Sequence, residues 1–320
     1  MKDKQHFKAL ITEALALIAA RQFSEARAML QEIAADPEVK SLGQITALGL
    51  PRKLHSAWLK LAKAEADPVV RSGYQYHLVP PPKLLAPYGR FDRAERIART
   101  AVDRLPAPRV IHQIWIGPKP VPVTCQAWAT YAKIQGYDYR LWREEDLATI
   151  EIDRNPVFAA MLAAGDFPGA VDVARYVILH RLGGIYLDCD WYPARTDMSF
   201  HERLPMAGLT ALAEDIPRLT GMGSTLLGNA FIAAPPHHPV FERMLQAIPK
   251  IWQDMPEAPA WWSTGPLLFT IVARSGSVSL ADAEIVAGQA EPRASLSKVA
   301  QMAMHIERHD GGILLAWKPW

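Results

Sequence analysis

Two carboxylates at the end of one predicted strand are the residues best suited to chemistry in this chain. Asp188 and Asp190 close the stretch GGIYLDCD, residues 183–190. Alternate side chains of a strand share one face, so Tyr186, Asp188 and Asp190 should point one way and Cys189 the other, into a core. Two carboxylates at this spacing on an exposed strand end suit a hard divalent cation that keeps open positions for phosphate oxygens.

An Asp-x-Asp pair by itself also occurs by chance in turns and solvated loops, so the preceding residues matter. Residues 168–182 predict a helix in which Asp172 and Arg175, three residues apart, share a face. An exposed helix ion pair that contributes little is the alternative. It fits less well here, because the helix leads directly into the carboxylate strand through Gly183 and Gly184.

The whole pattern, D-x-x-R-Y-x-x-L-x-x-x-G-G-I-Y-x-D-x-D over residues 172–190, resembles the signature of the DXD-containing sugar transferases. That family includes yeast initiating mannosyltransferases and bacterial capsule and lipopolysaccharide enzymes, and the glucosylating clostridial toxins are related to it. The resemblance covers about residues 108–320. It implies an α/β GT-A fold, a nucleotide-diphosphate sugar donor, Mn²⁺ or Mg²⁺ as metal, and retention of the anomeric configuration.

Weaker matches follow in the order of the family. The stretch RVIHQIWIG, residues 109–117, resembles the opening strand, which would place Trp115 against the nucleotide base. A core tryptophan is the alternative, since the chain has 10 Trp. Asn229 resembles the asparagine that faces the sugar, unless it only forms a turn.

The terminal match is the least complete. His309 with Trp317 resembles an element that closes over the diphosphate. The family usually has serine where this chain has Val171 and Ala316. Neither change removes a metal ligand, but the missing hydroxyl at residue 316 leaves the role of the closing element open.

The resemblance assigns the chemistry to a small set of side chains. Asp190 would be the direct metal ligand, and Asp188 would bind ribose or sugar hydroxyls and reach the metal directly or through water. Asp172 would accept hydrogen bonds from the donor sugar, and Arg175 would contact sugar or phosphate with its planar fork. No carboxylate is evidently placed as a nucleophile, which favours front-face attack over a covalent intermediate. The expected catalytic residues are Asp172, Arg175, Asp188 and Asp190, and the expected donor-binding residues are Trp115, Tyr186, Asn229, His309 and Trp317.

Composition is ordinary for a globular enzyme. The 320 residues carry a net charge of +2, which gives no nucleic-acid footprint, and the 2 cysteines make no disulfide framework. No apolar run reaches the length of a membrane span. Glu13 and Arg21 flank the apolar residues 14–20, so a signal peptide is not expected. These features predict a cytoplasmic enzyme, peripheral at most to the inner face of the membrane.

The sequence predicts three regions. Residues 1–80 read as a helical cap with one tetratricopeptide-like hairpin, and residues 81–107 as a proline-rich linker and a basic helix. Residues 108–320 form the catalytic domain. The arginines of the basic helix over 91–105 most simply make a solvated face, and contact with anionic lipid headgroups is the alternative. These arginines are Arg93, Arg96, Arg99 and Arg104.

From residue 109 the pattern alternates as in a parallel α/β sheet, which places ligands at the carboxyl ends of strands. We expect strands at 109–116, 137–142, 184–190, 206–213, 227–233, 283–287 and 311–317, and helices near 124–135, 168–182, 239–248 and 265–274.

The expected function is transfer of a sugar from a nucleotide-diphosphate donor, with a UDP-sugar favoured and GDP-mannose as the alternative, to a glycan or lipid-linked acceptor. Two other classes stay open. One is a toxin-like effector that glycosylates a protein. The other is a degenerate nucleotide-sugar-binding protein, which would be expected to have a broken carboxylate pair, whereas Asp188 and Asp190 are both present.

Overall fold

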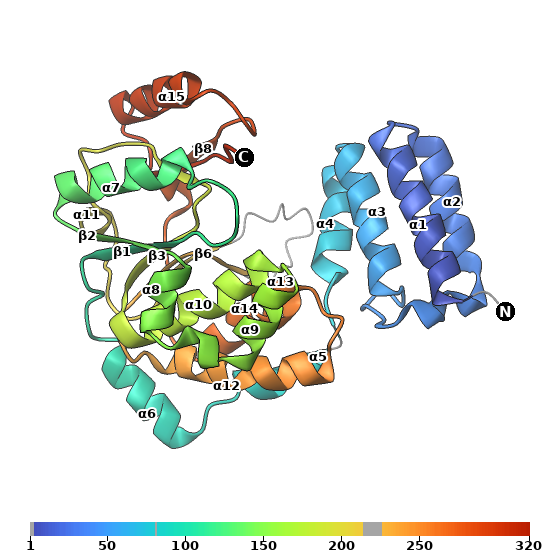
Figure 1. Cartoon of the computed structure of the whole chain (residues 1–320), viewed down its shortest axis with the longest axis horizontal. Coiled ribbons are helices and arrows are strands. Elements are labelled where there is room, and N and C mark those ends of the chain that lie inside the picture. The colour runs from blue at the N-terminus through green and yellow to red at the C-terminus, as the bar shows by residue number, and fades with distance from the viewer. Residues whose placement is uncertain (1–2, 81, 214–225) are drawn as a thin grey trace. The chain divides into compact units, whose positions relative to one another are not determined.

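The computed structural model describes residues 3–80, 82–213 and 226–320. They form two compact units, an N-terminal unit up to Pro87 and a C-terminal unit from Tyr88 onward. Figure 1 shows the first as blue helices and the second as a sheet flanked by helices. Each unit is described by itself, and the division into 1–80, 81–107 and 108–320 stays a prediction. Within the described residues no helix is long and apolar enough to cross a bilayer.

The N-terminal unit is helical, as expected. Residues 4–19 and 23–35 form its first two helices, and Phe7 and Leu30 are among the side chains at their buried contact. Residues 82–89 of the predicted proline-rich linker form short helical turns, because the fixed φ of a proline is compatible with a first helical turn. The helices are α1 (Lys4–Ala19), α2 (Phe23–Ala35), α3 (Arg52–Ala64), α4 (Pro68–His77) and α5 (Pro82–Leu85), with 3₁₀ turns η1 (Pro37–Leu42) and η2 (Ala86–Gly89).

The C-terminal unit confirms the α/β prediction. Its described strands form a six-stranded mixed sheet in the order β2-β1-β3-β6-β5-β7, with β1 parallel to both of its neighbours and β6 antiparallel to both of its own. A second sheet has the order β4-β9-β8. The strands are β1 (Val110–Ile114), β2 (Asp138–Trp142), β3 (Gly184–Leu187), β4 (Trp191–Pro193), β5 (Thr210–Ala213), β6 (Leu227–Ala234), β7 (Ser279–Leu280), β8 (Val286–Gln289) and β9 (Leu314–Ala316).

Helices cover both faces of the large sheet. In Figure 1, α7 lies above the sheet, whereas α10, α12 and α14 lie below it. The helix α10 is buried on nearly every side, because it packs against the sheet and also against α9 and α12. The helices are α6 (Arg93–Val102), α7 (Val123–Gln135), α8 (Glu144–Thr149), α9 (Pro156–Ala163), α10 (Phe167–Leu182), α11 (Phe200–Arg203), α12 (Pro239–Asp254), α13 (Ala260–Ser263), α14 (Pro266–Ala273) and α15 (Leu296–Arg308), with 3₁₀ turns η3 (Ile152–Arg154) and η4 (Ala283–Ile285).

Two predictions about local structure need correction. The strand expected over 184–190 ends at Leu187, so Asp188 and Asp190 lie in the turn that follows it. The amide of Asp188 still donates to the carbonyl of Ala230 on β6, but the carbonyls of residues 188–190 accept from other parts of the chain, so regular pairing does not continue. The basic helix was expected to be solvated along its arginines, but Arg99 is buried and donates hydrogen bonds to the carbonyls of Ala273 and Ser277.

Candidate active site

A cleft of about 370 Å³ opens beside the carboxyl ends of β1 and β3, where a parallel α/β arrangement places ligands. Aromatic side chains and charged side chains share its walls. They come from β1 and the loop after it, the start of α10, the turn after β3 and the end of the chain. The walls include Trp115, Phe167, Arg175, Tyr186, Asp188, Asp190, Lys318 and Trp320.

The two-glycine turn brings α10 and β3 together at this cleft. Gly183 and Gly184 have φ values of +63° and +97°, which favour glycine. A Cβ on Gly184 would also lie 2.8 Å from the carbonyl oxygen of Val110 on β1. Glycine is therefore required both for the backbone conformation and for the close approach of β3 to β1.

The turn with the two carboxylates is held by three separate elements. Gln113 of β1 donates to the carbonyl of Asp188 at 3.2 Å, and Thr124 of α7 donates to the carbonyl of Cys189 at 2.5 Å. The amide of Trp317 donates to the carbonyl of Asp190 at 2.8 Å. Three successive carbonyls thus have partners from distant parts of the chain, which fixes the direction of both carboxylates.

Asp188 is held from the strand side. The Tyr186 hydroxyl donates to Asp188 Oδ1 at 2.7 Å, and Arg175 Nη1 lies 3.2 Å from the same oxygen. The side chain of Asp188 is partly exposed to the cleft. Their hydrogen bond confirms the prediction that Tyr186 and Asp188 point to the same side.

Asp190 lies beyond Asp188 in the same cleft. Burial, and then repulsion from Asp188, raises the pKa of Asp190 to about 6. A cation bound by Asp188 and Asp190 would relieve the repulsion between their carboxylates. Across the described residues, no three His, Cys, Asp or Glu side chains gather as a metal cage, so the protein supplies at most a pair of carboxylates here. That donor set fits Mg²⁺ or Mn²⁺, which commonly take one or two carboxylates and leave positions for phosphate and water.

Behind the carboxylate turn, Asp172 is the centre of a buried polar network. It accepts hydrogen bonds from Asn229 Nδ2 at 2.8 Å and Thr264 Oγ1 at 3.0 Å, and it pairs with Arg175 at 2.9 Å. Burial raises its pKa to about 6, which still leaves it ionised at neutral pH. Asp172 and Arg175 therefore form a buried ion pair, and the carboxylate of Asp172 also accepts hydrogen bonds from Asn229 and Thr264.

Arg175 links this network to the cleft. It bridges Asp172 and Asp188, and its guanidinium carbon lies 4.4 Å from the centre of the Tyr186 ring. Burial opposes its charge, but the carboxylate of Asp188 and its other neighbours raise the pKa of Arg175 overall. Its Nη1 also donates to the carbonyl of Asn229 at 2.5 Å. The structure thus joins five of the predicted residues in one connected group, although Asp172 and Asn229 are buried and do not line the cleft.

Aromatic side chains form the opposite wall. Trp115 is half-buried, and its Nε1 donates to the carbonyl of Lys119 at 3.0 Å. Its ring meets the edge of the Trp320 ring, with centroids 4.8 Å apart. Trp115 therefore lines the cleft and is not a core tryptophan, whereas its stacking on a base stays a prediction.

Lys318 and Trp320 were not singled out from the sequence, yet both line the cleft. The attraction of Lys318 lowers the pKa of Asp190 against the larger effect of burial. A signal was present in the sequence, because a lysine and a tryptophan directly follow the Ala316-Trp317 match. Only packing could show that these residues return to the carboxylate turn.

The two residues of the predicted closing element are separated by the structure. Trp317 is 3% exposed and packs with Ala290 and Leu315. It borders a second depression that also includes Asp188 and Asp190. His309 is exposed at the end of α15, where its Nδ1 donates to the carbonyl of His305 at 2.8 Å, and it lines neither depression.

Comparisons with known proteins agree with the sequence pattern. Residues 123–204 match the family described as "Glycosyltransferase sugar-binding region containing DXD motif". Inositol phosphoceramide mannosyltransferase 2 of Schizosaccharomyces pombe is 30% identical over 168 residues, which are 50% of this chain and 44% of that protein. Mannosyl phosphorylinositol ceramide synthase CSH1 of Saccharomyces cerevisiae is 29% identical over 141 residues, or 42% and 34% of the two chains. The chain thus spans less than half the length of these relatives.

Two solved structures are similar in part. The PaToxG glycosyltransferase matches with 18% identity and a TM-score of 0.42, over 56% of this chain and 72% of that one. The catalytic domain of the alpha-toxin of Clostridium novyi matches with 10% identity and a TM-score of 0.32, over 80% and 76%. The resemblance predicted from the DXD pattern is confirmed by the family and sequence matches.

Proposed function

We propose that the chain is a glycosyltransferase that transfers a sugar from a nucleotide-diphosphate donor bound in the cleft beside Asp188 and Asp190; the matches of its DXD segment support this proposal. The observation that carries this proposal is one cleft with three features. It has two carboxylates on a rigid turn, a cation on either side of them in Arg175 and Lys318, and an aromatic wall. A nucleotide-diphosphate donor fits these features, because its anionic diphosphate suits the two cations and a metal on the carboxylates, and its base suits the aromatic wall.

The diphosphate would lie over the carboxylate turn, where Asp190 and Asp188 would hold Mn²⁺ or Mg²⁺. When bound, the metal would neutralise the charge that develops on the leaving diphosphate. Lys318 and Arg175 would add positive charge from the protein. Trp115 would offer a ring face to the base, and its contact with Trp320 holds that ring in place.

The buried group around Asp172 would orient the reacting part of the site. Asp172 holds Arg175, and Arg175 holds Asp188, at 2.9 and 3.2 Å. Preorganised charges of this kind need little rearrangement when charge develops in the transition state. Asp172 is enclosed by Asn229, Thr264 and Arg175, so it is not positioned as a nucleophile. Retention, which the family resemblance implies, would then proceed by front-face attack of the acceptor and not through a covalent intermediate on Asp172.

The acceptor is the least constrained part of the proposal. The names of the two yeast relatives state mannose transfer to inositol phosphoceramide, which supports a lipid-linked acceptor over a protein. They also make a mannose donor a necessary member of any donor screen beside UDP-sugars. The alternative of a toxin-like effector would predict transfer to a protein with no glycolipid product.

The test is a screen for donor hydrolysis. UDP-glucose, UDP-galactose, UDP-N-acetylglucosamine and GDP-mannose are incubated with the full chain, with Mn²⁺, with Mg²⁺, and with a chelator in excess. We expect release of the nucleotide diphosphate from one class of donor, with loss of release under chelation. Binding of nucleotide diphosphate without any turnover, with or without glycan or glycolipid acceptors, would support the degenerate binding protein. Turnover that is unchanged by chelation would contradict the metal assignment.

A further inference from the structure

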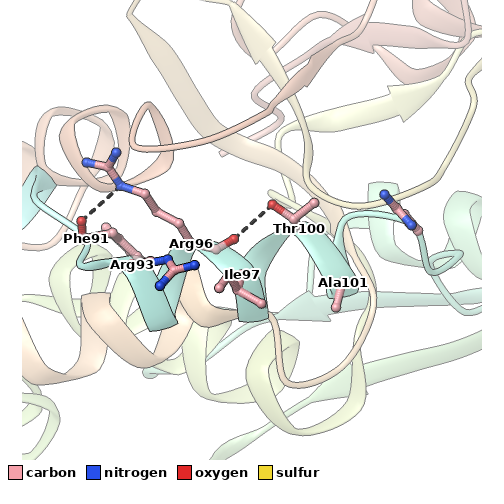
Figure 2. A pocket seen from close by; sticks show the side chains of 7 residues that line it. Phe91, Arg93, Arg96, Ile97, Thr100 and Ala101 are labelled. Atoms are coloured by element: carbon pink, nitrogen blue, oxygen red, sulfur yellow. Dashed lines mark hydrogen bonds between the residues drawn. The ribbon is translucent and has the colours of Figure 1, made fainter.

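The helix α6 presents a basic and apolar face on the surface of the C-terminal unit. Its outward side chains border a shallow hollow of about 620 Å³. Figure 2 shows Arg93, Arg96 and Ile97 projecting from one side of the helix, with Thr100 and Ala101 in the next turn. Arg104 completes the row. These positions repeat at helical spacing and therefore belong to one face.

The opposite face of α6 is fixed to the rest of the unit. Arg99 is buried and donates to Ser275 as well as to the carbonyls of Ala273 and Ser277. Glu95 pairs with Arg243 of α12. These contacts allow no free rotation of α6 about its axis, so the outward face is a permanent feature of the folded unit.

The carboxylates on α6 and next to its ends have other partners within the protein. Asp92 caps the helix by accepting from the amide of Glu95, and Glu95 itself pairs with Arg243. Asp103 accepts a hydrogen bond from His238 and lies 3.7 Å from Arg99. Within the described part of the chain, Arg93 and Arg104 have no carboxylate partner. The outward face therefore has an excess of positive charge.

Apolar side chains lie among these arginines. Ile97 is 60% exposed and Leu105, just after the helix, is 49% exposed. Burying such side chains is favourable by an amount that grows with the apolar area removed from water. A surface that unites both features suits a partner that offers anionic groups beside hydrocarbon. Nucleic acid offers the anions, but its exposed backbone provides no comparable apolar region for Ile97.

From this face we infer that α6 binds the surface of an anionic phospholipid bilayer, with its arginines among the headgroups and Ile97 at the acyl boundary. Basic side chains near an anionic leaflet each strengthen binding, and apolar side chains on the same helix add to it. The inference goes beyond the proposed function and does not depend on it. Donor chemistry and membrane binding can each fail alone.

The test measures cosedimentation of the full chain with two kinds of vesicle, pure phosphatidylcholine and phosphatidylcholine mixed with phosphatidylserine. We expect binding to the mixed vesicles only, weakened by added salt. The variant Arg93→Ala/Arg96→Ala/Arg104→Ala should lose about 100-fold in binding, since each arginine near the surface contributes roughly fivefold. Ile97→Ser should weaken binding by a smaller factor, about tenfold, because it removes the inserted side chain.

A matched control removes the same charge elsewhere. Arg140→Ala/Arg181→Ala/Arg308→Ala takes away three exposed arginines of other elements in the same unit and should keep wild-type binding. Equal loss in both triple variants would overturn the proposal, as would wild-type binding that does not distinguish the two vesicles. Preference for duplex DNA or RNA over the mixed vesicles would also overturn it. Because Arg96 donates to the carbonyl of Phe91, the double variant Arg93→Ala/Arg104→Ala repeats the test if the triple variant unfolds, with about a 25-fold loss expected.

Discussion

The helices α10 and α6 use arginine in opposite settings. Arg175 of α10 is 4% exposed and lies 2.9 Å from one carboxylate and 3.2 Å from another. Arg93 and Arg104 of α6 are exposed and have no such partner within the described residues. Removing a charge from water is costly, so a buried arginine persists only with close partners and a fixed geometry. An exposed arginine has no such requirement and keeps its charge available to an outside partner.

The same contrast separates the two kinds of site. Around α10, charges face one another across short distances and orient the carboxylate turn, which suits chemistry at a defined point. Along α6, charges repeat on a surface without fixed partners, which suits binding to an extended anionic surface.

Asp190→Asn should abolish catalysis without unfolding the protein. The amide occupies the same space in the cleft, but it removes a charge that would hold the metal, whose effect on charge development amounts to several kcal/mol. We therefore expect about a 1000-fold loss in kcat, by the factor of ten per 1.36 kcal/mol, and an unchanged Tm. Asp138→Asn, at an exposed position of β2, is the control. Near wild-type turnover in the Asp190 variant would remove it from the metal site.

Arg175→Leu should strongly destabilise the fold, because it leaves Asp172 buried and without its counter-charge. Breaking a buried pair in this way costs about 3–5 kcal/mol in the free energy of unfolding. Arg93→Leu on α6 should change that free energy by less than about 0.5 kcal/mol. Urea unfolding of both variants measures the comparison directly. Equal losses would mean that the two settings do not differ as described.

His112 should contribute a loss of stability in acid, opposite in sign to the contribution of Asp172 and Asp190, whose pKa values are raised to about 6 by burial. This side chain of β1 is buried beside the carbonyl of Gly183, and burial lowers its pKa to about 4. A depressed folded-state pKa means that the neutral form is favoured by folding, so its contribution is complete above the unfolded value near 6.5. The contribution is lost as the pH falls from 6.5 toward 4. The free energy of unfolding then decreases by at most about 3 kcal/mol, since each unit of pKa shift corresponds to about 1.36 kcal/mol. Unfolding at several pH values should show this loss as a difference, with the free energy of unfolding of the wild type falling relative to that of His112→Gln as the pH goes from 6.5 toward 4.

Trp115→Ala should raise the KM for the donor about tenfold, since the loss of a base-stacking ring costs on the order of 1–3 kcal/mol. Because Trp115 is half-buried in a cleft, Tm should change little. Trp128→Ala is the matched contrast, since Trp128 is fully buried and its truncation should cost about 3–5 kcal/mol of stability. A large fall in Tm for Trp115→Ala with unchanged KM would make Trp115 a structural residue.

Much of the site was predictable from local patterns. The helix expected over 168–182 is α10 at Phe167–Leu182, and the turn at Gly183 and Gly184 leads into β3 as expected. Periodicity and glycine conformations act over a few residues, so they are readable from the sequence. The end of β3 at Leu187 was not, because it depends on hydrogen bonds from Gln113 and Thr124 in other elements.

Burial was the property most often missed. Arg99 lies in the same kind of pattern as Arg93, Arg96 and Arg104, yet it alone of these four is buried. All four arginines were expected on a solvated face, and only the packing of α6 supplies the Ser275 hydroxyl and the Ser277 carbonyl that accept from Arg99. The short helices at 82–89 were missed for a related reason, since proline-rich sequence is compatible with both a linker and a first helical turn.

The sequence by itself determined the chemistry of the carboxylate turn, because Asp188 and Asp190 are joined by short chain length to the helix that precedes them. It also determined the α/β class through its alternation of periodic segments. Only the tertiary structure decided which distant residues meet this turn. Asn229 and Thr264 close around Asp172, and Lys318 and Trp320 return to the cleft from the chain end. These tertiary contacts depend on how whole elements pack, and the spacing of residues along the chain does not show that packing.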